Sequence, residues 1–378
     1  MRLDELGTTG KWVLLSTMCS AVLFLLLATA EGAVRLRAYL KYGYVWESNN
    51  YVTDEATGLY IPVPNSKIGE ININSAGFRG PDLAQIKPDL RIAFLGASTT
   101  YCAEVPNDQD HWPAVVAEML ARDTGLQTDY VNGGVPGYGV KHSLVNLNQR
   151  IAAYKPDLLM IYHATNDLSR HTFEQAQNEG LVKERPETER SWITNYSYLA
   201  YLVDLNLNIW LQQQSQQTQD VVGTLDPKLD ELTSRFRKEL ETLISKAKTA
   251  SEIVAIGTFS THFRDDQSRE YQVEAASTSL YYMPYMSIEG LLETFTAYNN
   301  VIRELAEAHD LILIEPSEFV PGDGDHFNDS IHFKTAGSRK MGEGVAAALL
   351  ASPEFQAFVA SKPLLVSQSS NITKSHIK

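Results

Sequence analysis

The sequence predicts an α/β fold in which helices cover both faces of a parallel sheet. Short apolar segments alternate with longer amphipathic ones from about residue 91 to residue 350, which is typical of strands joined by helices. The segment 157–162 (DLLMIY) is apolar without alternation, as expected of a strand that is buried on both faces. Hydrophobic residues make up 44% and charged residues 21% of the 378 residues, so the composition indicates a globular protein.

A transmembrane helix is predicted near the N-terminus. Residues 12–30 (WVLLSTMCSAVLFLLLATA) carry no charge and would span about 28 Å as a helix, close to the hydrocarbon thickness of a bilayer. The alternative is a cleaved signal peptide, because the run ends in Ala28-Thr29-Ala30, which resembles a cleavage site. The run is long for a signal peptide, so we expect an uncleaved single-pass anchor within an N-terminal segment of residues 1–37.

Residues 38–90 are rich in Tyr, Asn, Gly and Pro and contain no long periodic run. This composition predicts an irregular, membrane-proximal segment that packs on the domain that follows. Within it, residues 74–80 (NSAGFRG) are typical of a turn-rich clip.

The main domain is predicted to span residues 91–352. The predicted strands are residues 91–96, 129–132, 157–162, 252–258 and 311–314. The predicted helices are residues 112–122, 140–154, 229–249, 290–309 and 335–350. Insertions interrupt this alternation near residues 169–226 and 262–287; both contain several aromatic residues and follow strands, where loops line the ligand crevice of an open α/β sheet. Residues 353–378 form a C-terminal segment that ends in a polar tail.

Charge and cysteine content exclude several classes of protein. The chain has 32 Lys and Arg against 46 Asp and Glu, a net charge of −14, which disfavours nucleic acid as a partner because phosphate binding needs cations. The two cysteines, Cys19 and Cys102, are too few for a disulfide framework or a Cys-rich zinc module. Cys19 lies inside the apolar run and is not expected to pair with Cys102.

Four short segments carry side chains that could do chemistry. Ser98, in residues 96–100 (GASTT), follows the first strand; alternatively, this serine is only a helix cap. The glycine-rich residues 132–139 (NGGVPGYG) follow the second strand and can present backbone N–H groups to a ligand. Asn166 follows the third strand and can donate its amide to an oxyanion. In residues 329–332 (DSIH), the spacing lets Asp329 hold one imidazole nitrogen of His332 while the other faces a nucleophile.

The last of these segments also permits two other interpretations. It lies in a loop crowded with metal-ligand side chains: Asp323, Asp325, His326, Asp329 and His332. These residues could bind a metal ion, or they could form a plain solvated acidic loop.

Together, the four segments resemble the SGNH/GDSL hydrolase family over roughly residues 90–350. The residues that carry the resemblance are Ser98, Gly134, Asn166, Asp329 and His332, with Pro156-Asp157 before the third strand and Gly337 after the histidine. There are two departures, because Ala97 replaces the family's Asp and Ala164 replaces a Gly in the turn that aims Asn166. The resemblance implies a flavodoxin-like three-layer α/β/α sandwich with a five-stranded parallel sheet.

A serine-esterase mechanism follows from these residues and the resemblance. His332 takes the proton of Ser98 as it attacks an ester carbonyl, and Asp329 orients the imidazole. The N–H groups of Ser98 and Gly134 and the side chain of Asn166 form the oxyanion hole. Water then releases the acid from the acyl-serine, so no metal or organic cofactor is required.

The anchor and the aromatic insertions suggest a large polar substrate at a membrane surface. The interpretation we favour is removal of O-acetyl groups from a cell-envelope or exported carbohydrate. A lipid esterase or thioesterase, or an O-acyltransferase acting on a glycan, would use the same triad. A non-catalytic, membrane-anchored glycan-binding module is a third alternative, which the intact set of site residues disfavours.

The orientation of the anchor is only weakly indicated by charge. Lys11 and Arg2 precede the apolar run and Arg35 and Arg37 follow it, so positive charge is nearly balanced across it. An envelope substrate and the family's frequent location outside the cytoplasm favour an extracytoplasmic, periplasmic or cell-surface hydrolase domain.

Overall fold

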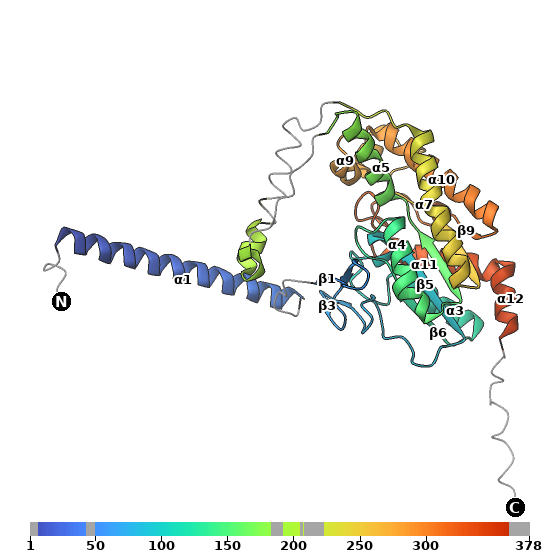
Figure 1. The fold of residues 1–378 in the computed structure, drawn as a ribbon, viewed down its shortest axis with the longest axis horizontal. Coiled ribbons are helices and arrows are strands. Elements are labelled where there is room, and N and C mark those ends of the chain that lie inside the picture. Colours follow the sequence, from blue (N-terminus) through green and yellow to red (C-terminus); the bar gives the residue numbers. More distant parts are fainter. Residues whose placement is uncertain (1–6, 43–49, 183–191, 205–206, 208–222, 363–378) are drawn as a thin grey trace, which may run out of the picture.

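The structure is a computed structural model that describes residues 7–42, 50–182, 192–204, 207 and 223–362. An α/β body contains the sheet, and the N-terminal helix α1 (Thr8–Tyr42) extends away from it (Figure 1). The predicted polar tail, residues 367–378, and much of the 169–226 insertion lie outside the described residues.

A five-stranded, fully parallel sheet forms the centre of the body, in the order β6-β5-β7-β8-β9. Its strands are β5 (Leu90–Gly96), β6 (Thr128–Asn132), β7 (Leu158–Tyr162), β8 (Ile253–Gly257) and β9 (Ile312–Ile314). Every residue of β5, β7 and β8 is buried, which explains the absence of polar alternation in the sequence. The predicted strands are thus confirmed to within about one residue at each end.

Helices cover both faces of the sheet and complete the three layers. One layer contains α3 (Trp112–Thr124) and α11 (Thr335–Ala351), which pack on each other, and α12 (Pro353–Ser361) packs on α11. The other contains α4 (Val140–Asn146), α5 (Thr165–Asn178), α7 (Leu229–Ala250) and α10 (Ile288–His309). This arrangement confirms the predicted flavodoxin-like α/β/α sandwich.

The prediction missed the helices inside the insertions. Helix α5 takes up the start of the 169–226 insertion, and its buried face carries polar residues such as His171, Thr172 and Gln175. Leu168 and Ala176 are the only apolar residues on this buried face, so the sequence offers few apolar positions from which to recognise the helix. The 262–287 insertion similarly contains α8 (Arg269–Ala275) and α9 (Ser277–Tyr282). The helix predicted at 140–154 is α4 followed by a π-helical and then a 3₁₀ turn.

Residues 50–82 form two small hairpins that pack against the body. The hairpin strands are β1 (Tyr51–Thr53) with β2 (Tyr60–Pro62), and β3 (Lys67–Ile68) with β4 (Ile71–Asn72). Leu59 and Ile61 pack on Ala97, Val135 and Tyr138, which belong to the turns that follow β5 and β6. These hairpins therefore support the edge of the sheet at which the candidate site lies.

The clip at residues 74–80 inserts a buried arginine beneath the loop that follows Ser98. Arg79 is 1% exposed and donates to the carbonyl oxygens of Tyr101, Cys102 and Val105. Its Nε lies 3.1 Å from a carboxylate oxygen of Asp108. Burying the guanidinium without these acceptors would cost free energy, so the loop is stable where its carbonyl oxygens and Asp108 meet Arg79. Arg79 therefore fixes the position of the 101–108 loop.

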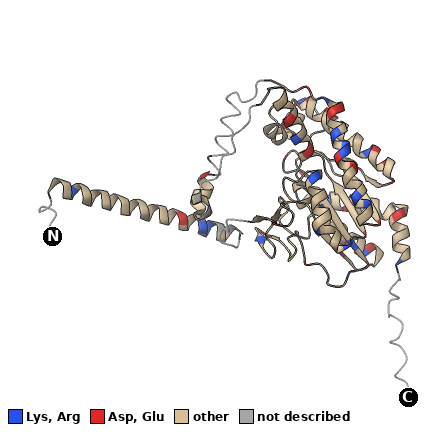
Figure 2. Cartoon of the chain, viewed as in Figure 1, with Lys and Arg blue, Asp and Glu red and all other residues tan. Residues whose placement is uncertain are grey.

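Helix α1 is long and apolar enough to cross a membrane. Its candidate span is Thr8–Arg37, with a mean hydropathy of 2.3 and no part buried in the body. Charged residues lie at the two ends of α1 and leave its middle uncharged (Figure 2). The helix continues to Tyr42, beyond the predicted limits at residues 30 and 37, and is compatible with either an anchor or a signal sequence.

Candidate active site

Ser98 lies at a sharp turn between β5 and the short helix α2 (Ser98–Tyr101). The turn requires a glycine before it, because a Cβ on Gly96 would lie 2.0 Å from Thr100 Oγ1 and 3.0 Å from the Tyr162 carbonyl oxygen. As the first residue of α2, Ser98 has no acceptor for its N–H within the helix. The turn thus presents both the hydroxyl and the N–H of Ser98 at the carboxyl edge of the sheet.

Ser98, His332 and Asp329 form a continuous hydrogen-bonded chain. His332 Nε2 lies 2.8 Å from Ser98 Oγ, and His332 Nδ1 lies 2.7 Å from Asp329 Oδ2. The other carboxylate oxygen of Asp329 accepts the N–H groups of Ile331 and His332, each at 2.9 Å. The loop between β9 and α11 therefore holds the carboxylate rigidly against the imidazole.

This geometry argues against the metal-binding interpretation of the 323–332 loop. Both ring nitrogens of His332 are hydrogen-bonded, one to Asp329 and one to Ser98, so neither is directed at a shared ion position. His326 pairs separately with Asp323, at 2.7 Å. The loop thus contains two independent Asp–His pairs, and only the second contacts the serine.

The surroundings of His332 favour its protonated form. Burial by itself would lower the pKa of His332, but the hydrogen bond that His332 donates to Asp329 and the negative charges of Glu104 and Asp329 raise that pKa above the ordinary value of 6.5. Burial likewise opposes ionisation of Asp329, yet the bond and charge of His332 and the two backbone N–H groups hold the pKa of Asp329 below its ordinary value. The pair is therefore suited to stabilise an imidazolium.

Asn166 lies at the same edge of the sheet, in the first turn of α5. One hydrogen of its amide is donated to the Tyr138 carbonyl oxygen at 2.8 Å, which leaves the second hydrogen for another acceptor. The Ala164 that replaces a glycine here has φ −166°, an extended value that any residue adopts. The extra methyl group therefore does not displace Asn166 by backbone strain.

Gly134, predicted to donate its N–H to the oxyanion, already has an acceptor for that N–H within the protein. Its N–H already donates to Asn132 Oδ1 at 3.0 Å, and a Cβ on Gly134 would lie 2.6 Å from Tyr101 N. Gly134 is therefore packed against the turn of Ser98, with its donor used inside the protein.

Gly137 is the glycine of this loop that faces open space. It has φ +84°, a Cβ there would meet nothing within 4 Å, and it lines the same cavity as Asn166. No acceptor within the described residues takes its N–H. Sequence reasoning missed Gly137 because every glycine of NGGVPGYG carries the same backbone donor, and only the fold decides which one is free.

A sequence model of the GDSL-like Lipase/Acylhydrolase family matches residues 94–340, which include all of these residues. The chain belongs to this family. As a member, it is a carboxylic ester hydrolase, which confirms the family resemblance and the enzyme class predicted from the sequence.

Several solved structures are similar to this GDSL-like hydrolase. One is an alpha/beta hydrolase enzyme from the metagenome of Lake Arreo, with 14% identity, 68% of this chain and 94% of that chain covered, and a TM-score of 0.43. An acetylxylan esterase from Geobacillus stearothermophilus shows 14% identity, 70% and 96% coverage, and a TM-score of 0.42. A lipase/acylhydrolase from Enterococcus faecalis shows 17% identity, 69% and 95% coverage, and a TM-score of 0.40. No curated protein matches the chain.

A buried charge network supports the oxyanion side of this hydrolase. Asp167, next to Asn166, is fully buried and accepts the N–H of Val140 with both carboxylate oxygens, each at 3.1 Å. Arg170 bridges Asp167 at 3.0 Å and Glu239 at 2.8 Å. Asp167 therefore ties the first turn of α5 to the start of α4, just after the loop that contains Gly137.

This network is also the one group within the described residues whose donor atoms are close enough to hold a metal ion. Asp167, His171 and Glu239 place one ligand atom each within 4.8 Å of the others. Arg170 occupies the space between the two carboxylates, and Lys141 lies 3.1 Å and Arg235 3.3 Å from Glu239. Because these cations already neutralise the carboxylates, the residues fit a structural ion-pair network better than a metal site.

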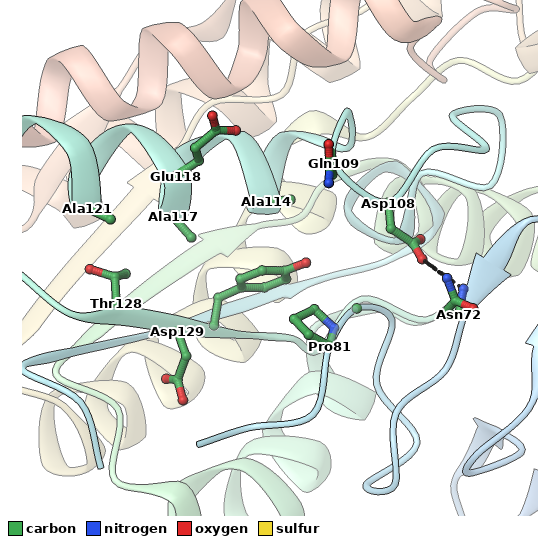
Figure 3. Close-up of a pocket in the computed structure, with 12 residues that line it drawn as sticks. Asn72, Pro81, Asp108, Gln109, Ala114, Ala117, Glu118, Ala121, Thr128 and Asp129 are labelled. Atoms are coloured by element: carbon green, nitrogen blue, oxygen red, sulfur yellow. Dashed lines mark hydrogen bonds between the residues drawn. The ribbon is translucent and has the colours of Figure 1, made fainter. Parts of the chain in front are cut away.

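Two cavities differ in their relation to the site. One of about 290 Å³ adjoins the oxyanion side and is lined by Gly137, Gly139, His142, Asn166, Ser169, Arg170, Phe173, Tyr282 and Tyr285. Another, of about 690 Å³, lies where Ala114, Ala117 and Ala121 of α3 face Thr128 and Pro81 (Figure 3). None of the candidate site residues lines this second cavity, so the smaller one is the candidate substrate pocket.

Proposed function

We propose that this hydrolase acts through an acyl-serine intermediate, with Ser98 as nucleophile, His332 as general base and acid, and Asp329 as the orienting carboxylate. The continuous bonding from Asp329 through His332 to Ser98 is the observation that carries this proposal. Ser98 Oγ attacks the ester carbonyl carbon while His332 Nε2 accepts its proton, and the imidazolium returns that proton to the departing alcohol oxygen. Water then attacks the acyl-serine with His332 again as base, which releases the acid.

The oxyanion formed in each step is held by the N–H groups of Ser98 and Gly137 and by the side-chain amide of Asn166. Substitution of Asn166 by alanine removes the donor that is needed only in the transition state. We expect kcat to fall by about 10²–10³-fold while KM stays within a few-fold. Steady-state kinetics on a chromogenic acetyl ester measure both constants. A loss smaller than about tenfold would remove Asn166 from the oxyanion hole.

The choice of Gly137 over Gly134 is tested without substituting either glycine. A phosphonate that labels Ser98 places a negatively charged oxygen where the oxyanion forms. In protein with ¹⁵N-labelled glycine, the amide proton of Gly137 should move downfield on labelling, because it gains a charged acceptor. The Gly134 amide should move little, since it stays bonded to Asn132. The reverse pattern would return the role to Gly134.

The activity of the enzyme should fall at acid pH through protonation of His332. Among described histidines with a shifted pKa, only that of His332 is raised; burial lowers the pKa of His163 to about 3 and that of His171 to about 4. The base must be neutral, so kcat/KM should decline as pH falls through a pKa above 6.5. A pH profile of kcat/KM with its acid limb at or below that value would contradict the assignment.

For the substrate, we propose an O-acetylated carbohydrate of the cell envelope or an exported polysaccharide. The 290 Å³ cavity beside Asn166 combines exposed aromatic side chains, Phe173 and Tyr282, with the polar groups of His142 and Arg170. A sugar ring presents apolar C–H faces and hydroxyl groups, so this mixture suits it better than it suits an acyl chain.

The substrate proposal is tested with esters of increasing acyl length, followed by acetylated polysaccharides. We expect the highest kcat/KM with acetyl esters and release of free acetate from the polysaccharide. A preference for long acyl chains would favour a lipid esterase. Transfer of the acyl group to an added sugar, in place of acetate release, would identify an acyltransferase.

We also propose that α1 anchors the enzyme in a membrane with the α/β body outside the cytoplasm. The uncharged middle of α1 and the absence of buried residues in its span support an anchor. Protease added to intact spheroplasts should digest the body. Complete protection until lysis would reverse the orientation, and loss of α1 from the mature protein would identify a signal peptide.

A further inference from the structure

A short part of the 169–226 insertion contacts α1. Residues 192–195 form a 3₁₀ turn and residues 198–204 a helix. This segment, drawn in yellow-green, lies beside the C-terminal part of α1 and apart from the α/β body (Figure 1). We refer to residues 193–204 as the arm segment.

Glu31 of α1 holds the start of the arm helix. Its carboxylate accepts the backbone N–H groups of Tyr198 and Leu199, each at 2.9 Å, and the hydroxyl of Ser197 at 2.8 Å. A carboxylate at a helix N-terminus compensates the positive end of the helix dipole and satisfies donors that have no partner inside the helix. One α1 side chain therefore anchors an element that is more than 160 residues away in the sequence.

A second residue of α1 strengthens this contact. Arg35 donates to Glu31 at 2.5 Å and to the carbonyl oxygen of Tyr196 at 3.2 Å. Ser197 also caps the arm helix from within, because its Oγ accepts the N–H of Ala200 at 3.0 Å. The arm segment thus has a defined start at the level of Glu31.

The arm segment exposes side chains that water does not favour. Ile193 is 46% exposed, Val203 58% and Tyr196 75%, and the only charged residue between 193 and 204 is Asp204. Tyr198 and Tyr201 stack with ring centroids 6.2 Å apart. Tyrosine is enriched at the headgroup level of a bilayer, where its ring contacts apolar groups and its hydroxyl contacts water, and exposed aliphatic side chains gain from leaving water there.

The position of Glu31 places the arm segment at this level. Glu31 directly follows the uncharged run 12–30, so it reaches the headgroups when that run fills the hydrocarbon layer. We propose that the arm segment is a second membrane contact, an interfacial element that Glu31 holds against α1 with its exposed apolar side chains among the lipid headgroups. This inference depends on the proposed anchoring by α1 and adds a second point of attachment between the catalytic body and the bilayer.

Depth-dependent fluorescence quenching of the full-length protein in phosphatidylcholine–phosphatidylglycerol nanodiscs tests the proposal. A polarity-sensitive dye is attached to Ile193→Cys or Val203→Cys in a Cys19→Ser background. Cys102 stays in place, because it is buried and burial raises the pKa of its thiol to about 12. In a separate protein, the dye is attached to the native Cys19, which is exposed on α1, and reports insertion of the anchor. The matched control in the body is dye on Lys238→Cys, on the exposed face of α7, in the Cys19→Ser background.

We expect nitroxides near the headgroups to quench the dye at residues 193 and 203, and nitroxides near the acyl chain ends to quench it at residue 19. Neither should quench it at residue 238. The interfacial contact would be overturned, and the anchor left intact, if the dye at residues 193 and 203 were as little quenched as the dye at residue 238 while the dye at residue 19 was quenched. If the dye at residue 19 were not quenched, the anchor itself would be refuted, and the interfacial contact would be refuted with it.

The role of Glu31 is tested in the Val203→Cys protein. Glu31→Ala should reduce headgroup quenching of the dye at residue 203 toward the level at residue 238. In a separate Glu31→Ala protein that keeps Cys19, quenching of the dye at residue 19 should not change. Arg37→Ala removes an exposed charge from the same helix and should leave headgroup quenching of the dye at residue 203 unchanged. Undiminished quenching in Glu31→Ala would overturn the role of Glu31. Hydrolysis of a soluble acetyl ester, expected to be equal in all variants, shows that each is folded.

Discussion

Substitution of Ser98 by alanine should reduce esterase activity by on the order of 10⁵–10⁶-fold in kcat, since the attacking oxygen is removed from a triad that acts as a unit. Ser98 is only half-buried, and within the described part of the chain its side chain is hydrogen-bonded to His332 alone. The melting temperature should therefore stay close to that of the parent protein. Kinetics on a chromogenic acetyl ester and a thermal unfolding curve measure the two quantities.

The chain offers a matched control in a second serine–histidine contact. Ser143 Oγ lies 2.7 Å from His163 Nε2, but both residues are buried and belong to the core. Ser143→Ala should lower stability by about 1 kcal/mol and keep kcat within a few-fold. A fully active Ser98→Ala enzyme would refute the proposed nucleophile.

Substitution of Asp329 by asparagine should lower kcat by about 10⁴-fold. The amide cannot hold His332 in the tautomer that accepts the Ser98 proton, and it removes the charge that stabilises the imidazolium. Because Asp329 also raises the pKa of His332, the acid limb of the kcat/KM profile should move to lower pH in the variant. Both effects are measured in one set of pH-dependent kinetics.

Asp323→Asn is the control for this change, because Asp323 and His326 form an equivalent pair in the same loop, also at 2.7 Å. It should change kcat by no more than a few-fold. Equal losses in the two variants would mean that the loop only requires its Asp–His pairs for folding. Activity lost on chelation and restored by zinc would instead support a metal in this loop.

The sequence alone determined the sheet and the identity of most candidate site residues. Strands β7 and β8 are buried on both faces and leave apolar runs in the sequence, and β6 and β9 were located from their place in the alternation of strands and helices. Ser98, Asn166, Asp329 and His332 were identified because each follows a strand or precedes the last helix, and the carboxyl ends of parallel strands share one edge. The spacing of Asp329 and His332 is local, so the sequence already limited how the two could pair.

Only the tertiary structure decided the features that depend on distant partners or on the use of a backbone donor. Asn132 takes the N–H of Gly134 and leaves that of Gly137, a difference that glycine content does not encode. Helix α5 was not predicted because most of its buried side chains are polar and are satisfied by hydrogen bonds, with only Leu168 and Ala176 packed in the apolar core. Arg79 beneath the 101–108 loop and Glu31 on the arm segment act across long separations in the chain. Hydrophobic periodicity records burial by apolar side chains, whereas hydrogen bonds between remote residues leave no periodic trace in a single sequence.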